Sequence, residues 1–140
     1  MLSLADTCKA KKLRITKARL SIVQALDDAD DHPDALTIHA RAKQHDPRVS
    51  QASVYRTLKW LETLGLIKKL DFGEGRFRYE SAQKPHHNHL VDLGSGEILE
   101  FDDQELALLA RNISARLGFV LSHHRVDLFG YRSLQMTDSE

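Results

Sequence analysis

Apolar side chains recur every three or four residues in several segments of the first half of the chain, which is the spacing of one helix face. This pattern predicts helices over residues 2–12, 17–27, 35–44 and 51–64. The expected buried positions are Leu20, Ile22, Val23 and Leu26 in the second helix and Val54, Leu58, Leu61 and Leu64 in the fourth. The apolar positions of the third helix include Leu36, Ile38 and Ala42. Thr16, Asp34 and Ser50 are the expected N-caps, because short polar side chains accept hydrogen bonds from a first helical turn.

Two strand-like runs follow, over residues 66–72 and 76–80, around Gly73-Glu74-Gly75. Glycines between two such runs indicate a β-hairpin. Helices, a recognition-type helix and then a two-stranded hairpin predict a winged helix-turn-helix. A small α+β domain with no nucleic-acid role is the alternative.

The second half of the chain has a different order of elements. Residues 89–93 and 97–101 predict a second hairpin around Gly94-Ser95-Gly96, and residues 119–131 predict a long strand. Between them, Asp102 or Asp103 caps a helix that runs to Leu117. Its apolar stripe is Leu106, Leu109, Ile113 and Leu117. A unit of about 45 residues buries little core alone, so we expect it to pair with a second copy in a homodimer.

The expected fold class is therefore α+β, with an N-terminal winged helix-turn-helix followed by a small α/β dimerisation domain. The expected boundaries are 1–82 for the DNA-binding domain, 83–85 for a hinge, 86–132 for the dimerisation domain and 133–140 for a disordered polar tail.

The formal net charge of zero conceals a strong asymmetry. Residues 1–84 carry 16 Lys and Arg against 11 Asp and Glu, whereas residues 85–140 carry 4 against 9. Residues 9–19 form a basic run with no acidic residue: Lys9, Lys11, Lys12, Arg14, Lys17 and Arg19. Together with the polar outer face of the fourth helix and the wing arginines Arg76 and Arg78, this run favours DNA over a merely solvated surface.

Composition excludes several other classes of protein. No apolar run approaches the roughly 20 residues of a membrane span, and the N-terminus lacks the apolar core of a signal peptide. A single cysteine, Cys8, excludes an intrachain disulfide framework, and we expect a cytoplasmic protein. No HExxH or Gly-x-Ser-x-Gly motif is present, so we do not expect an enzyme.

Three of the eight histidines fall within four positions, in Pro85-His86-His87-Asn88-His89-Leu90. Side chains alternate along a strand, so His87 and His89 should face one way and His86 and Asn88 the other. Two imidazoles on one face supply half of a metal site, which other ligands must complete. The alternative is a polar turn between domains with solvated histidines.

With these motifs in hand, residues 5–131 resemble the ferric uptake regulator family of metal-dependent bacterial repressors. The most specific parts of the resemblance are Arg14-Ile15-Thr16-Lys17-Ala18-Arg19, Ala52-Ser53-Val54-Tyr55-Arg56-Thr57-Leu58, Phe72-Gly73-Glu74-Gly75 and His86-His87-Asn88-His89-Leu90. The absence of CxxC is most like the alphaproteobacterial iron- and manganese-responsive branch.

The resemblance implies a repressor of metal-homeostasis genes that binds palindromic operator DNA as a homodimer, with pairing of dimers into tetramers left open. The expected DNA-binding residues are Arg14, Thr16, Arg19, Gln51, Ser53, Tyr55, Arg56 and Arg76. The family's regulatory site, at the hinge, maps onto His32, Glu80, His87 and His89, with Glu100 as a fifth ligand. One divalent metal per subunit is implied, Fe(II) or Mn(II) in the cell, with Zn(II) able to replace it in vitro.

Three departures from the family pattern change what is expected. Asp92 and Ser95 stand where many members have cysteines, so no structural zinc held by four cysteines is expected. A second metal site would use His86, Asn88, Ala107 and His124, of which Asn is a weak ligand and Ala is none. Glu100 replaces the Asp usual in peroxide-sensing relatives. A haem-responsive or zinc-responsive regulator of the same fold remains the alternative.

Overall fold

A computed structural model describes residues 2–85 and 87–133. The chain forms two compact units, residues 1–84 and 85–140. None of the helices in the described part of the chain is both long and apolar enough to cross a membrane.

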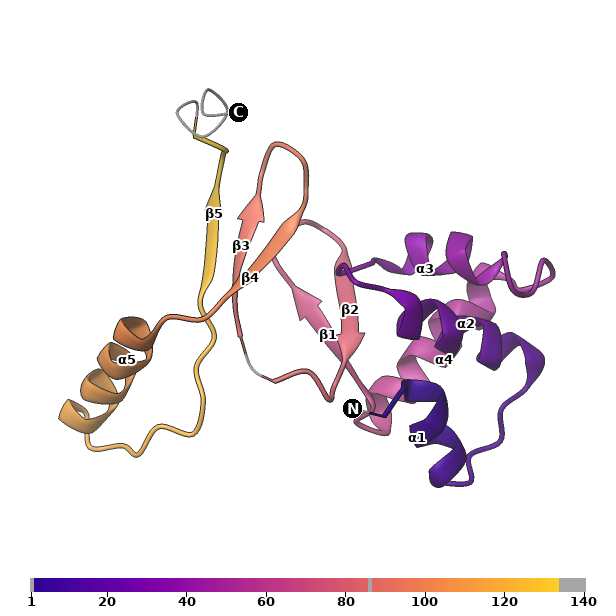
Figure 1. The fold of residues 1–140 in the computed structure, drawn as a ribbon, viewed down its shortest axis with the longest axis horizontal. Helices are drawn as coiled ribbons and strands as arrows, with labels where there is room; N and C mark the ends of the chain where they lie inside the picture. The colour runs from indigo at the N-terminus through magenta and orange to yellow at the C-terminus, as the bar shows by residue number, and fades with distance from the viewer. Residues whose placement is uncertain (1, 86, 134–140) are drawn as a thin grey trace. The chain divides into compact units, whose positions relative to one another are not determined.

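The N-terminal unit contains four helices: α1 Leu4–Ala10, α2 Lys17–Asp28, α3 Ala35–Ala42 and α4 Gln51–Thr63 (Figure 1). The predicted caps are confirmed, because the side chains of Thr16, Asp34 and Ser50 each accept a hydrogen bond from a first-turn backbone N–H. The first helix is shorter than predicted. Ser3 caps its start, and Lys12 has a φ of 56°, which right-handed helical backbone does not allow.

The core of this unit lies between the helices and includes Ile22, Ile38, Leu58 and Leu61. Two residues predicted to be buried, Leu20 and Leu64, are instead exposed, and so is the apolar Leu36. Leu20 is two residues from Ile22, or about 200° around the helix. Leu36 is in the same way two residues from Ile38, and Leu64 is the C-cap of α4, beyond its last helical residue.

A β-hairpin completes the N-terminal unit. Strand β1, Ile67–Asp71, pairs antiparallel with β2, Phe77–Ser81, in a register that sets Leu70 opposite Arg78. Gly73 and Gly75 in the connecting turn both have positive φ, as the glycine-rich turn requires. Four helices and this hairpin form the predicted winged helix.

The C-terminal unit is a three-stranded sheet with one helix. Its elements are β3 Asn88–Asp92, β4 Ile98–Phe101, α5 Gln104–Arg116 and β5 Asp127–Gly130 (Figure 1). The strand order is β4-β3-β5, with β3 antiparallel to β4 and parallel to β5. Asp103 is the N-cap of α5, and Gly118, with a φ of 88°, follows its C-cap.

The long strand predicted over residues 119–131 is wrong for most of its length. Only Asp127–Gly130 pairs with β3, starting at the register His89↔Asp127, and residues 119–126 are irregular. Strand-like composition is not sufficient, because a strand also needs a neighbour for its backbone groups. The tail prediction falls on residues outside the described ones, apart from Ser133.

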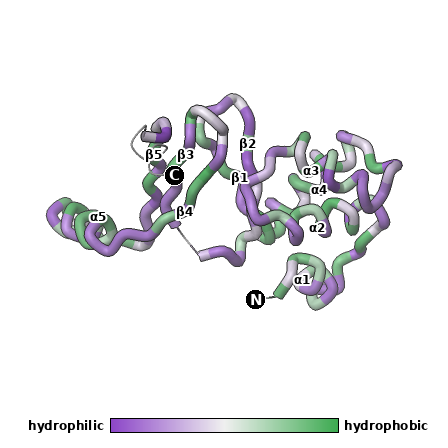
Figure 2. Tube along the Cα trace, turned by 45° about the horizontal axis from the view of Figure 1, so that its top comes forward, coloured by the Kyte–Doolittle hydropathy of each residue, from purple (hydrophilic) through white to green (hydrophobic). Residues whose placement is uncertain are grey.

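The predicted apolar stripe of α5 forms but is not covered. Hydrophobic positions recur along the helix (Figure 2), yet no residue of α5 is buried. Leu109, Ile113 and Leu117 are 51%, 41% and 70% exposed. An uncovered stripe of this kind marks a surface suited to a partner.

Candidate metal centre and nucleic-acid interface

Two predicted ligands come together in the N-terminal unit. His32 lies in the loop before α3 and Glu80 lies in β2, and His32 Nε2 is 3.3 Å from Glu80 Oε2. Two hydrogen bonds hold this loop to β2: Arg78 Nη1 donates to the His32 carbonyl at 2.8 Å, and Tyr79 N donates to the Pro33 carbonyl at 2.9 Å. An imidazole and a carboxylate on such a scaffold form one pair of N and O ligands for a first-row metal.

Three predicted ligands come together in the C-terminal unit. The ring centroids of His87 and His89 are 4.7 Å apart, which confirms that the two side chains share one side. Glu100 lies opposite His89 in the β3–β4 register, and its Oε1 is 3.2 Å from His87 Nε2. This unit therefore holds two imidazoles and a carboxylate in one cluster.

Hydrogen bonds also orient the rings of both histidines. His87 Nδ1 is 2.7 Å from the Pro85 carbonyl oxygen, and His89 Nδ1 is 3.3 Å from Asp127 Oδ1. Carbonyl and carboxylate oxygens accept, so Nδ1 donates in both rings, and hydrogen bonds of this kind orient the imidazoles of metal-binding histidines. Sequence reasoning missed Asp127, because only the parallel pairing of β3 with β5 brings it to His89.

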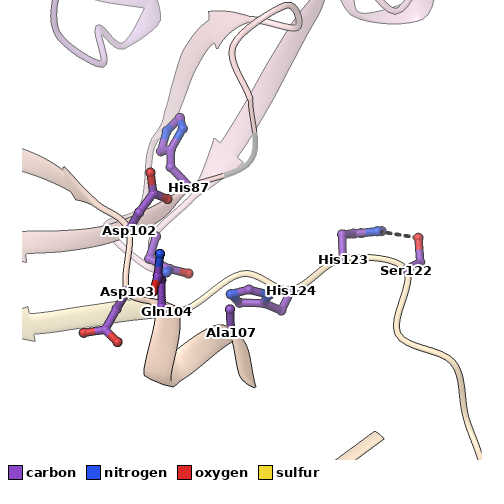
Figure 3. Close-up of a pocket in the computed structure, with 9 residues that line it drawn as sticks. His87, Asp102, Asp103, Gln104, Ala107, Ser122, His123 and His124 are labelled. Atoms are coloured by element: carbon purple, nitrogen blue, oxygen red, sulfur yellow. Dashed lines mark hydrogen bonds between the residues drawn. The ribbon is translucent and has the colours of Figure 1, made fainter. Parts of the chain in front are cut away.

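Three of the four residues of the second predicted metal site line one cavity of about 550 Å³ in the C-terminal unit. Asn88, Ala107 and His124 are all in its wall, whereas His86 lies outside the described residues. Figure 3 shows the Ala107 methyl group beside His124, with His123 hydrogen-bonded to Ser122. The Asn88 amide oxygen already accepts a hydrogen bond from Val126 N. These observations argue against strong metal binding here.

The positions of the missing cysteines form a polar turn. Asp92 Oδ1 accepts from Gly94 N at 2.8 Å, and Asp92 Oδ2 accepts from the Ser95 hydroxyl at 2.8 Å. Together with the backbone bond from Ser95 N, these contacts lower the pKa of Asp92, with the Ser95 hydroxyl the largest cause. This hydrogen-bonded aspartate is the last residue of β3, and its carboxylate holds the turn that leads to β4.

The outer face of α4 carries the predicted groove-reading side chains. Gln51, Tyr55 and Arg56 are exposed. Ser53 is half-buried, and its hydroxyl accepts from Ser50 and from Arg56. A helix with an apolar inner face and these donors outside is suited to the major groove.

The other predicted DNA contacts are in part engaged within the protein. Arg14 is exposed, while Thr16 caps α2 and Arg19 contacts Trp60. Arg76 is paired with Asp34 at 2.6 Å and with Glu74 at 3.2 Å.

Arg78 requires a correction, because it is buried rather than displayed on the wing. It donates from Nε and Nη2 to Glu74 and from Nη1 to His32. Glu74 and the His32 carbonyl together draw its guanidinium into the unit. Sequence alternation could not reveal these acceptors.

Helices α1–α4 with the hairpin define a winged-helix DNA-binding protein, and the histidine–carboxylate clusters add metal ligands. The chain belongs to the ferric uptake regulator family, whose profile matches residues 10–129. It is 38% identical to the ferric uptake regulation protein of Rhizobium leguminosarum bv. viciae over 128 residues, covering 91% of this chain and 90% of that one. It is 41% identical to that of Brucella abortus (strain 9-941) over 117 residues, covering 84% and 83%.

A solved structure of a zinc-bound manganese uptake regulator is 36% identical, with a TM-score of 0.81 over 94% of this chain and all of that one. The chain is thus a metal-responsive transcriptional regulator of this family. Members of the family are regulators and not enzymes, and they bind operator DNA as dimers. The predicted fold class and family are confirmed, and the haem-responsive alternative is not favoured.

Proposed function

We propose that the protein is a repressor of metal-homeostasis genes that is activated by Fe(II) or Mn(II). His32 and Glu80 of the N-terminal unit and His87 and His89 of the C-terminal unit hold one ion per subunit, with Glu100 as a fifth ligand. The observation that carries the proposal is the grouping of imidazoles with carboxylates in both units, His32 with Glu80 in one and His87 with His89 and Glu100 in the other. Three imidazoles and carboxylates, without thiolate, suit Fe(II), Mn(II) and Zn(II).

In this proposal, residues 83–85 are a hinge between a DNA-binding domain, residues 1–82, and a dimerisation domain, residues 86–132. The bound ion supplies coordination bonds that join the two domains. His32 lies two residues before Asp34, the cap of α3, and its carbonyl accepts a hydrogen bond from Arg78 of β2, so its position is coupled to the wing. A shift of the domain equilibrium from 1:99 to 99:1 requires about 5.5 kcal/mol of differential affinity.

The proposed target is a palindromic operator, with two α4 helices of the dimer about 34–36 Å apart, or one DNA turn. Arg14 contacts the minor groove, and Gln51, Ser53, Tyr55 and Arg56 contact the major groove and the phosphates beside it. Thr16 and Arg76 lie at the edges of this surface and contact the backbone, Arg76 after exchange of its carboxylate partners for phosphate. A regulator of chromosomal operators acts in the cytoplasm.

The test is operator binding by chelator-treated protein, titrated with Mn(II) as a stable substitute for Fe(II). The operator is selected from a random DNA pool by the Mn(II)-loaded protein. We expect a steep gain in affinity that is lost in His87→Ala and in His89→Ala and retained in His123→Ala, a matched control in the same unit. A wild-type metal response in both of the first two variants would exclude this site.

A further inference from the structure

Arg19 forms an unusual set of contacts for a residue on a DNA-facing surface. Its guanidinium carbon lies 4.0 Å from the centroid of the Trp60 ring. Its Nη1 donates to the main-chain carbonyl of Arg14 at 2.9 Å, and its backbone N donates to the Thr16 hydroxyl at 3.2 Å. One side chain therefore contacts the loop before α2 and a residue of α4.

The loop that Arg19 contacts carries the arginine proposed for the minor groove. Leu13 and Ile15, on either side of Arg14, pack against the hydrophobic core, so the loop is already anchored by its apolar neighbours. The hydrogen bond from Arg19 further fixes the position of the Arg14 carbonyl group. Trp60 packs against the same core, which makes it a rigid platform for the guanidinium.

We propose that Arg19 and Trp60 are positioning residues: they fix the distance between Arg14 and α4, so that the minor-groove and major-groove contacts are made in one register. The proposal rests on the proposed DNA contact of Arg14. A stacked, planar guanidinium suits this role, because it can contact a ring face and donate in its own plane at the same time. A lysine ammonium is a point charge and cannot reproduce both contacts.

The prediction that separates positioning from direct contact concerns salt. The loss of one phosphate contact makes the negative slope of log K against log salt concentration shallower by about 0.9. Trp60→Leu and Arg19→Lys remove no charge, so by themselves they remove no ionic contact. If they release Arg14 from its place, however, they should make the slope shallower in the same way as Arg14→Ala does.

The experiment measures binding of the Mn(II)-loaded full chain to the selected operator duplex between about 50 and 200 mM salt. We expect Trp60→Leu and Arg19→Lys to weaken binding by about threefold to tenfold and to make the slope shallower. Trp60→Phe keeps an aromatic face and should bind as the wild type does. In an Arg14→Ala background, Trp60→Leu and Arg19→Lys should have no further effect.

Thermal unfolding of each variant identifies any that fail to fold. If Trp60→Leu fails to fold, Arg19→Lys alone tests the proposal. Wild-type affinity and slope in the folded charge-conserving variants, with Arg14→Ala impaired, would overturn the positioning role and leave the Arg14 contact intact. Additive losses in the double variants would also overturn it. Wild-type binding by Arg14→Ala would instead overturn the proposed Arg14 contact, and the positioning role with it.

Discussion

The guanidinium of Arg78 donates a hydrogen bond of 2.8 Å to the backbone carbonyl of His32, across 46 positions of sequence. The same guanidinium pairs with Glu74 at 2.9 Å, next to the turn of the wing. This pairing lowers the pKa of Glu74, with the Arg78 hydrogen bond the largest cause. A proposed metal ligand and the wing thus share one buried side chain.

Replacing Arg78 with Met should destabilise the N-terminal unit. The change leaves Glu74 without its buried cationic partner, so we expect a loss of about 2–4 kcal/mol in the free energy of unfolding, measured by urea denaturation. Arg132→Gln is the matched control: the Arg132 side chain is more than half exposed, so water screens its ion pairs with Glu97 and Asp92, and its loss should change stability by less than about 0.5 kcal/mol. Equal stability of the two variants would show that burial does not increase the contribution of the Arg78 contacts to the free energy of unfolding.

Asp34 should make the stability of the protein depend on acid pH. Burial raises the pKa of Asp34, but hydrogen bonds from Thr37 and Arg76 outweigh it and hold the value at about 2, against 3.8 ordinarily. A lowered pKa stabilises the fold above about pH 4, and this contribution is lost as the pH falls toward 2.

Asn caps helices nearly as well as Asp, so Asp34→Asn isolates the charge. The variant should be less stable than the wild type by on the order of 1 kcal/mol at neutral pH, with the gap closing between about pH 4 and pH 2. Asp30→Asn, in the exposed loop nearby, is the control. A gap that does not change with pH would mean that the Asp34 charge contributes nothing to stability.

Gly65 ends the recognition helix with a φ of 74°, and the space where a Cβ would lie is open. The cost of a side chain there is therefore one of backbone conformation and not of packing. Gly65→Ala should lower the free energy of unfolding by about 1–2 kcal/mol, and Gly65→Asn by less, because Asn tolerates this conformation better. Thermal unfolding of the two variants would measure the difference, and equal losses would contradict this explanation.

The exposed stripe of α5 should be covered by a second copy of the chain. Ile113→Glu places a charge on this stripe, and we expect it to shift the protein from dimer to monomer in sedimentation equilibrium. Arg111→Glu, on the same helix but not in the stripe, should leave the dimer unchanged. A dimeric Ile113→Glu protein would place the dimer interface on another surface.

The features that could be predicted from sequence are those that depend on near neighbours. Thr16, Asp34 and Ser50 cap helices through residues three positions away, and strand alternation places His87 and His89 together. What could not be predicted depends on residues distant in sequence. Arg78 is buried because the His32 carbonyl accepts its hydrogen bond, and Asp127 orients the His89 ring. The strand predicted over residues 119–131 failed for the same reason, since only its end meets β3.

The parallel pairing of β3 with β5 has a consequence for folding kinetics. His89 and Asp127 are 38 residues apart, and they meet only after the crossover through α5 has closed. Parallel pairing across such a loop is slow compared with hairpin or helix formation. The orientation of the His89 imidazole is therefore among the last features to form. A folding intermediate with its winged helix complete would already have the proposed DNA-binding surface but not yet the final arrangement of the proposed metal ligands in the C-terminal unit.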